Sequence, residues 1–136
     1  MKTAEREIAA IQSHAEQIRN DDAHEIATAS PLDTWAQGDV GIICLAKLPA
    51  GCRLDPNPTA QLAPGATQGS RHCLTDLAAV TLHRLTDATP LDGPIIEAPQ
   101  GCTIAHPEHG DVTLPPGFYG VIYQRAYADD LRRVQD

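Results

Sequence analysis

Residues 106–110, with the sequence HPEHG, form the densest group of metal-ligand and acid–base side chains in this chain. Two imidazoles, His106 and His109, flank a proline and a glutamate, and the final glycine can adopt the positive φ that closes a hairpin. Sets of histidine and carboxylate ligands suit zinc, iron or manganese. The residues predicted to hold a divalent metal are His72, His106, Glu108 and His109. The alternative is a polar hairpin tip that binds no cofactor and whose histidines cap the turn backbone.

The sequence gives little support for other catalytic chemistry. Cys73 directly follows His72, but neighbouring residues on a strand point to opposite faces, so the two cannot act as a nucleophile–base pair. The chain contains no GxSxG, Walker or GxGxxG pattern. We therefore expect a protein that is not an enzyme.

The elements that would position the histidines are strands. Segments 98–127 predict two hairpins, one turning at residues 106–110 and the other at Pro115-Pro116-Gly117. In the last strand, the alternation places Phe118 and Ile122 on one face and tyrosines on the other. Because both faces carry large residues, we expect this strand to be covered on both sides, by a helix or by a neighbouring subunit.

Earlier segments predict a β domain preceded by a helical arm. Residues 3–20 place isoleucines and an alanine at a 3-4-3 spacing, which is typical of one helix face, and residues 21–34 read as a polar linker. The apolar stripe could pack on its own domain or against the same helix of other chains. We expect a 1–34 arm and a 35–136 domain that is mainly β, either a small sandwich or a barrel, with a jelly-roll or cupin-like topology as one form. The proline-rich stretch from Leu48 to Gly69 predicts a long loop with little regular structure.

Composition restricts the partners. The formal net charge is −8, with eighteen acidic and ten basic residues and no basic run. Nucleic acid and anionic membranes are therefore not expected as partners. No apolar stretch approaches the roughly 20 residues that cross a bilayer. The four cysteines lack a CxxC pair, which favours reduced thiols in the cytoplasm.

Two resemblances add to this picture. Residues 64–72, PGATQGSRH, are faintly similar to cupins, in which a glycine precedes a His-x-His pair and then a glutamate. Only Gly65 and His72 match that pattern, since Ser70 and Leu74 occupy ligand positions.

The stretch HPEHGDVTLPPGFYGVIYQRAY (residues 106–127) resembles small β-rich proteins encoded in phages and prophage-like regions. The matching positions are His72, His106, Glu108, His109, Gly110, Leu114 to Gly117, Gln124, Arg125 and Tyr127. This resemblance implies a phage origin and a structural role.

Three functions follow as expectations. The first is a virion-associated capsid decoration or cement subunit, found in the virion or in the host cytoplasm, with a homo-oligomer or capsid protein as partner. The second is a cupin-like metal enzyme that uses the four predicted ligands. The third is a cytosolic protein-binding module.

Overall fold

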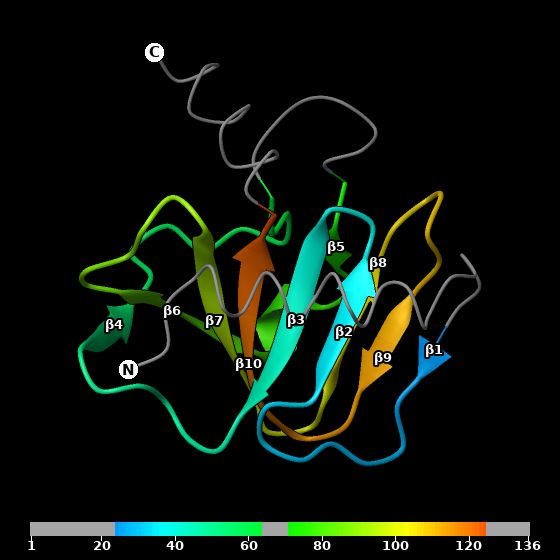
Figure 1. The fold of residues 1–136 in the computed structure, drawn as a ribbon, viewed down its shortest axis with the longest axis horizontal. Coiled ribbons are helices and arrows are strands. Elements are labelled where there is room, and N and C mark those ends of the chain that lie inside the picture. Colours follow the sequence, from blue (N-terminus) through cyan, green and yellow to red (C-terminus); the bar gives the residue numbers. More distant parts are fainter. Residues whose placement is uncertain (1–23, 64–70, 125–136) are drawn as a thin grey trace.

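The computed structural model describes residues 24–63 and 71–124, and this part of the chain is a two-layer β structure. The mainly β prediction is therefore confirmed, and the strands form two sheets (Figure 1). The helix expected over residues 3–20 lies outside the described residues; within them there is no α-helix. The elements are β1 (His24–Glu25), β2 (Thr34–Gln37), β3 (Val40–Leu45), β4 (Cys52–Leu54), β5 (Cys73–Leu74), the 3-10 helix η2 (Leu77–Ala79), β6 (Thr81–Leu85), β7 (Asp92–Ala98), β8 (Cys102–Ala105), β9 (Val112–Leu114) and β10 (Gly117–Tyr123).

The larger sheet has six strands in the order β2-β3-β10-β7-β6-β4, all antiparallel. Its central strand, β10, pairs in an unbroken register with β3, from Phe118 opposite Leu45 to Tyr123 opposite Val40. On its other side, β10 pairs with β7 through a bulge, where Gly120 lies opposite Ile95 and Ile122 opposite Asp92. Three steps along β7 thus match two along β10, which reverses the facing of the β7 residues beyond the bulge.

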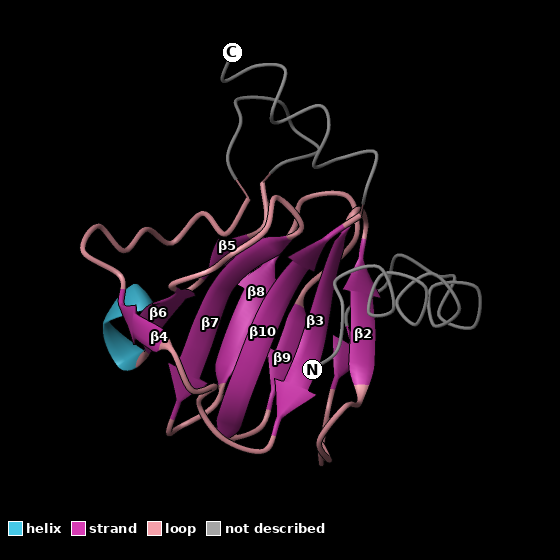
Figure 2. Cartoon of the chain, turned by 60° about the vertical axis from the view of Figure 1, so that its left-hand side comes forward, coloured by secondary structure: helices cyan, strands magenta, loops and turns pink. Residues whose placement is uncertain are grey.

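The smaller sheet has four strands in the order β1-β9-β8-β5. Figure 2 shows β7, β10, β3 and β2 as one layer, with β8 and β9 visible behind them. The hairpin β8–β9 confirms the first of the two predicted hairpins.

The second predicted hairpin is wrong, because β9 and β10 belong to different sheets. The Pro115-Pro116 segment carries the chain across from one layer to the other. Strand periodicity defines which residues share a face, but it contains no information on which strand becomes the partner.

Two short strands lie where no strand was predicted. β1 falls in the stretch read as a linker and pairs in parallel with β9, with His24 opposite Val112. β4 falls in the predicted Leu48–Gly69 loop and pairs with the edge of β6. Pairings of two or three residues are too short to impose an alternating pattern on the sequence.

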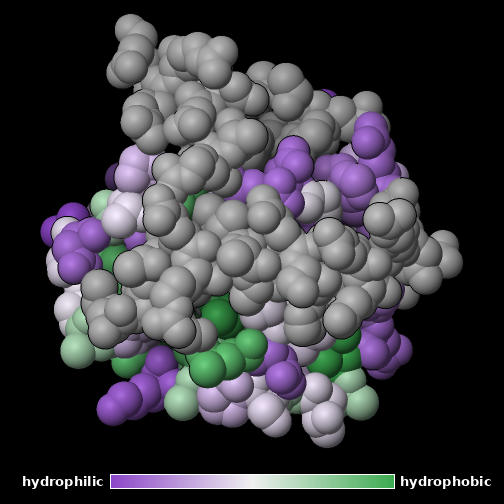
Figure 3. Space-filling view, in the orientation of Figure 1, coloured by the Kyte–Doolittle hydropathy of each residue, from purple (hydrophilic) through white to green (hydrophobic). Residues whose placement is uncertain are grey.

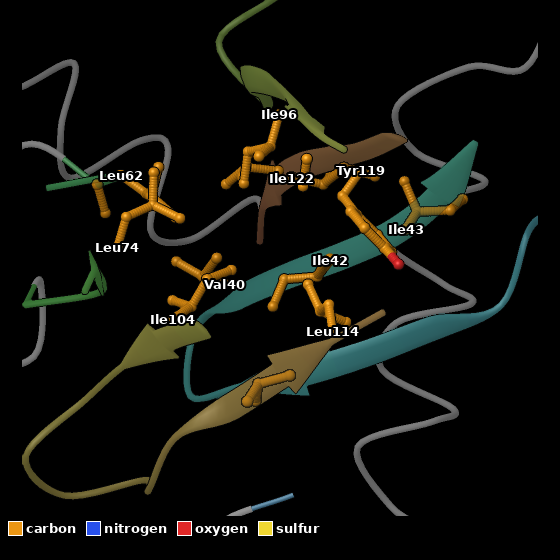
Figure 4. Packing of buried hydrophobic residues seen from close by; sticks show 14 of the residues in the cluster. Val40, Ile42, Ile43, Leu62, Leu74, Ile96, Ile104, Leu114, Tyr119 and Ile122 are labelled. Carbon is orange, nitrogen blue, oxygen red and sulfur yellow. The ribbon is translucent and has the colours of Figure 1, made fainter. Parts of the chain in front are cut away.

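The hydrophobic core lies between the two sheets. Val40 and Ile42 of β3 are fully buried and are grouped with Ile104 of β8 and Leu114 of β9 (Figure 4). Tyr119 of β10 is also fully buried, and its hydroxyl donates a hydrogen bond to the carbonyl of Pro115. Burial of this phenol raises its pKa above the usual range.

No helix long and apolar enough to span a membrane occurs in the described part of the chain.

Candidate functional site

The predicted histidine tip closes the β8–β9 hairpin, and one histidine organises its backbone. Gly110 has a φ of 76°, as expected, and its N–H bonds to the carbonyl of His106 at 3.2 Å. The Nδ1 atom of His106 accepts the backbone N–H groups of Glu108 at 3.0 Å and His109 at 3.1 Å. His106 therefore caps its own turn through Nδ1.

A buried glutamine connects this tip to both sheets. Gln37, the last residue of β2, is 1% exposed, and its Nε2 donates to the carbonyls of Ile104 at 2.9 Å and Gly110 at 2.7 Å. Since both amide protons are used, Oε1 is the acceptor for Nδ1 of His72 at 2.9 Å. One side chain thus joins the six-stranded sheet to β8, to the tip and to His72.

Three imidazoles stack in a row beside this glutamine. The ring centroids of His72 and His106 lie 4.5 Å apart, and those of His106 and His109 lie 4.6 Å apart. His109 packs against the β2–β3 turn, where a Cβ built on Gly38 would lie only 2.6 Å from the ring. Gly38 has a φ of 58°, so both the backbone and the close approach require glycine.

The hydrogen-bond network assigns the tautomers of the two buried rings. Nδ1 of His106 accepts two N–H groups, so the proton of the neutral ring is on Nε2. His72 differs, because its Nδ1 carries a proton and donates it to Oε1 of Gln37. Both rings thus use Nδ1 within the protein: His106 accepts from the turn backbone and His72 donates to Gln37.

The four predicted ligands are only partly brought together. His72, His106 and His109 form the row, whereas Glu108 is exposed at the tip. No group of three or more His, Cys, Asp or Glu side chains is arranged to hold a metal ion among residues 24–63 and 71–124. Sequence reasoning missed Gln37, since nothing near a glutamine at a strand end indicates contacts 35 to 73 residues away.

A shallow cleft of about 300 Å³ lies on the smaller sheet, away from the histidine row. It is lined by Thr75, Asp76, Ala79, Gln100, Gly101, Cys102, Thr103, Thr113 and Leu114. The hydroxyls of Thr103 and Thr113 bond to each other at 3.0 Å. Burial raises the pKa of the Cys102 thiol to about 11, which leaves very little of the nucleophilic thiolate at neutral pH.

A second histidine–carboxylate pair lies on the larger sheet. Nε2 of His83 is 2.9 Å from Oε1 of Glu97, on the neighbouring strands β6 and β7. The two side chains lie near each other on one sheet face, and no nucleophile is paired with this histidine in the hydrogen bonds of the described residues.

The comparisons with known proteins agree with the extent of this β domain. Neither the curated proteins nor the solved structures include a match. One family model matches residues 36–124, which run from within β2 to just past β10 and contain the whole histidine row. That model covers more than half of the chain, and the chain therefore belongs to the family described as a domain of unknown function, DUF8820.

Proposed function

We propose that this chain is a non-enzymatic structural protein of phage type, and that it serves as a capsid decoration or cement subunit. In this proposal its partners are further copies of itself, a capsid protein, or both, and its locations are the virion and the cytoplasm of the host. The sandwich has the two-layer form that jelly-roll topologies share.

The observation that carries the proposal is the use of the polar side chains at the tip. Gln37 donates to two backbone carbonyls, and His106 accepts two backbone N–H groups. A catalytic residue must have its reacting atom available to substrate, whereas these atoms are committed to fixing a loop. The histidine row is best explained as a rigid support for the tip.

The cleft gives further support. Its titratable lining residues are Asp76 and Cys102, and burial disfavours the thiolate of the latter. The lining contains neither a histidine nor a lysine that could act as a base beside the thiol. This set does not supply the nucleophile, base and orienting group that covalent catalysis needs.

The direct test is a protein census of purified phage particles from the organism that encodes this chain. We expect the chain in purified particles, with a copy number in a simple whole-number ratio to that of the major capsid protein. Its presence in the producing cell together with its absence from particles would contradict the proposal.

The cupin-like alternative has one supporting observation. Nδ1 of His72 is anchored by a carbonyl oxygen, the arrangement that commonly orients a metal-ligating imidazole. Metal analysis of the purified chain and of two variants, His106→Ala and His83→Ala, tests this alternative. Stoichiometric metal that is lost only in His106→Ala would favour the metal enzyme over a structural protein.

A further inference from the structure

The six-stranded sheet has a second apolar face, on the side away from the four-stranded sheet. Strand pairing defines this outer face, because Gln37 and Tyr119 point into the core and their strand neighbours point outward. A Cβ built on Gly120 would lie 3.2 Å from Ile43, 3.7 Å from Ile95 and 3.7 Å from Leu45. The outer apolar face consists of Ile43, Leu45, Ile95, Phe118 and Ile122.

The central residues of this outer apolar face are buried. Ile43 and Ile122 are 3% exposed and Ile95 is 5% exposed, although the other sheet packs on the opposite side. Contacts with neighbouring strands alone leave the side chains of a bare sheet face open to solvent. The outer apolar face therefore has a covering layer. Figure 3, in the same view as Figure 1, shows apolar residues among polar ones on the described surface.

The N-terminal segment matches what such a layer requires. Its sequence places Ile8, Ile11, Ala15 and Ile18 along one helix face and charged residues on the other. As a helix, the stretch from residue 8 to 18 is about 15 Å long. The three strands that carry the outer apolar face, β3, β10 and β7, span about 10 Å at the usual strand spacing.

The point of attachment also fits. The described chain begins at β1, the edge strand of the smaller sheet, and in Figure 1 this strand lies on the same side of the molecule as β2. A segment that leaves β1 can reach the larger sheet past its β2 edge. At Gly120 the side chains of Ile43, Ile95 and Leu45 close over the backbone, so the middle of the outer apolar face is continuous apolar surface.

We infer that residues 1–23 of the same chain dock on the outer apolar face, with the isoleucine stripe packed across β3, β10 and β7. The arm is then a third layer of the domain, and the face is unavailable to a second copy or another protein while the arm is in place. This inference does not depend on the proposed function.

Methyl NMR of the full chain tests the contact directly. The chain has ten isoleucines, so selective labelling of their δ1 methyls gives a small set of signals. We expect NOEs that connect Ile8, Ile11 or Ile18 with Ile43, Ile95 or Ile122, unchanged on dilution. Absence of these NOEs, or NOEs seen only between differently labelled chains in a mixed sample, would overturn the inference; the second result would assign the covering layer to another copy.

A matched pair of variants provides an independent readout. Ile11→Asp places a charge in the stripe, whereas Ser13→Asp places one on the opposite face of the expected helix. Ile11→Asp should raise the fluorescence of a hydrophobic dye several-fold and shift the Ile43 and Ile95 methyl signals, while the Ile104 signal in the inner core stays in place. Equal effects of the two variants, or no effect of Ile11→Asp, would contradict the docked arm.

Discussion

At the residue scale, Gln37 is the single side chain on which the histidine tip depends most. Gln37→Leu keeps the approximate volume but removes the hydrogen bonds to Ile104, Gly110 and His72. Because buried carbonyls then lose their donor, we expect the free energy of unfolding to fall by about 3 kcal/mol. Urea denaturation monitors the change, and Gln100→Leu, at an exposed position, should stay within about 0.5 kcal/mol of the parent. Equal effects of the two substitutions would show that the network contributes little.

Asp55 directly follows β4, the edge strand at the other end of the larger sheet from Gln37 and β2. This carboxylate is expected to make the stability of the protein depend on pH. Burial alone would raise the pKa of Asp55, but hydrogen bonds from the Asn57 N–H and from Arg84, together with the charge of Arg84, hold it below its usual value. A lowered folded-state pKa stabilises the protein above the unfolded pKa of about 3.9, and this stability is lost as the pH falls through the folded value.

Asp55→Asn should therefore lower the free energy of unfolding by about 1 kcal/mol at pH 7, a modest value because Arg84 is 43% exposed. The difference from the parent should disappear once the pH has fallen below the lowered folded-state pKa of Asp55. Denaturation at several pH values measures it, with the exposed Asp87→Asn as control. A difference that is constant with pH would exclude the ion pair as its source.

At the scale of elements, the packing of the β2–β3 turn against the hairpin tip can be separated from backbone strain. Gly38→Ala meets both a positive φ and the His109 ring, whereas Gly51→Ala meets a positive φ and only a 3.4 Å contact with Thr86. We expect Gly51→Ala to cost about 1 kcal/mol and Gly38→Ala about 1 to 3 kcal/mol more.

The double variant Gly38→Ala/His109→Ala isolates the ring contact. In the His109→Ala background, the whole cost of Gly38→Ala should fall to that of Gly51→Ala. The free energy of unfolding is measured by urea denaturation for the parent, Gly38→Ala, His109→Ala and the double variant. An additional cost that persists without the ring would place the strain elsewhere in the turn.

The elements differ in how far their sequence predicts them. The Gly110 turn and the alternation in β10 follow from local chemistry, because a positive φ and a two-residue period appear directly in the residue types. β1 and β4 do not, since a strand of two or three residues depends on a partner distant in sequence. The β9–β10 connection is likewise not decided by its own sequence. Its proline-rich turn suits a change of sheet as well as a hairpin within one sheet, which is why the hairpin prediction is wrong.

At the scale of the whole molecule, the proposed structural role predicts self-association or assembly on a lattice. Light scattering of the full chain should give a closed oligomer such as a trimer, or a monomer that binds assembled capsids. A monomer that does not bind capsids would contradict a decoration role. That result would not contradict the inferred docking of residues 1–23, since this contact lies within one chain.

The sequence by itself determined the β class, the polar tip and the two-sided character of the last strand, because these depend on local periodicity and on turn residues. Only the tertiary structure decided that three distant histidines form one row and that Glu108 lies apart from it. Only the tertiary structure also joined Gln37 to the tip, across separations of up to 73 residues. The reason is physical: hydrogen bonds between sheets depend on strand order and layer packing, which no short stretch of sequence encodes.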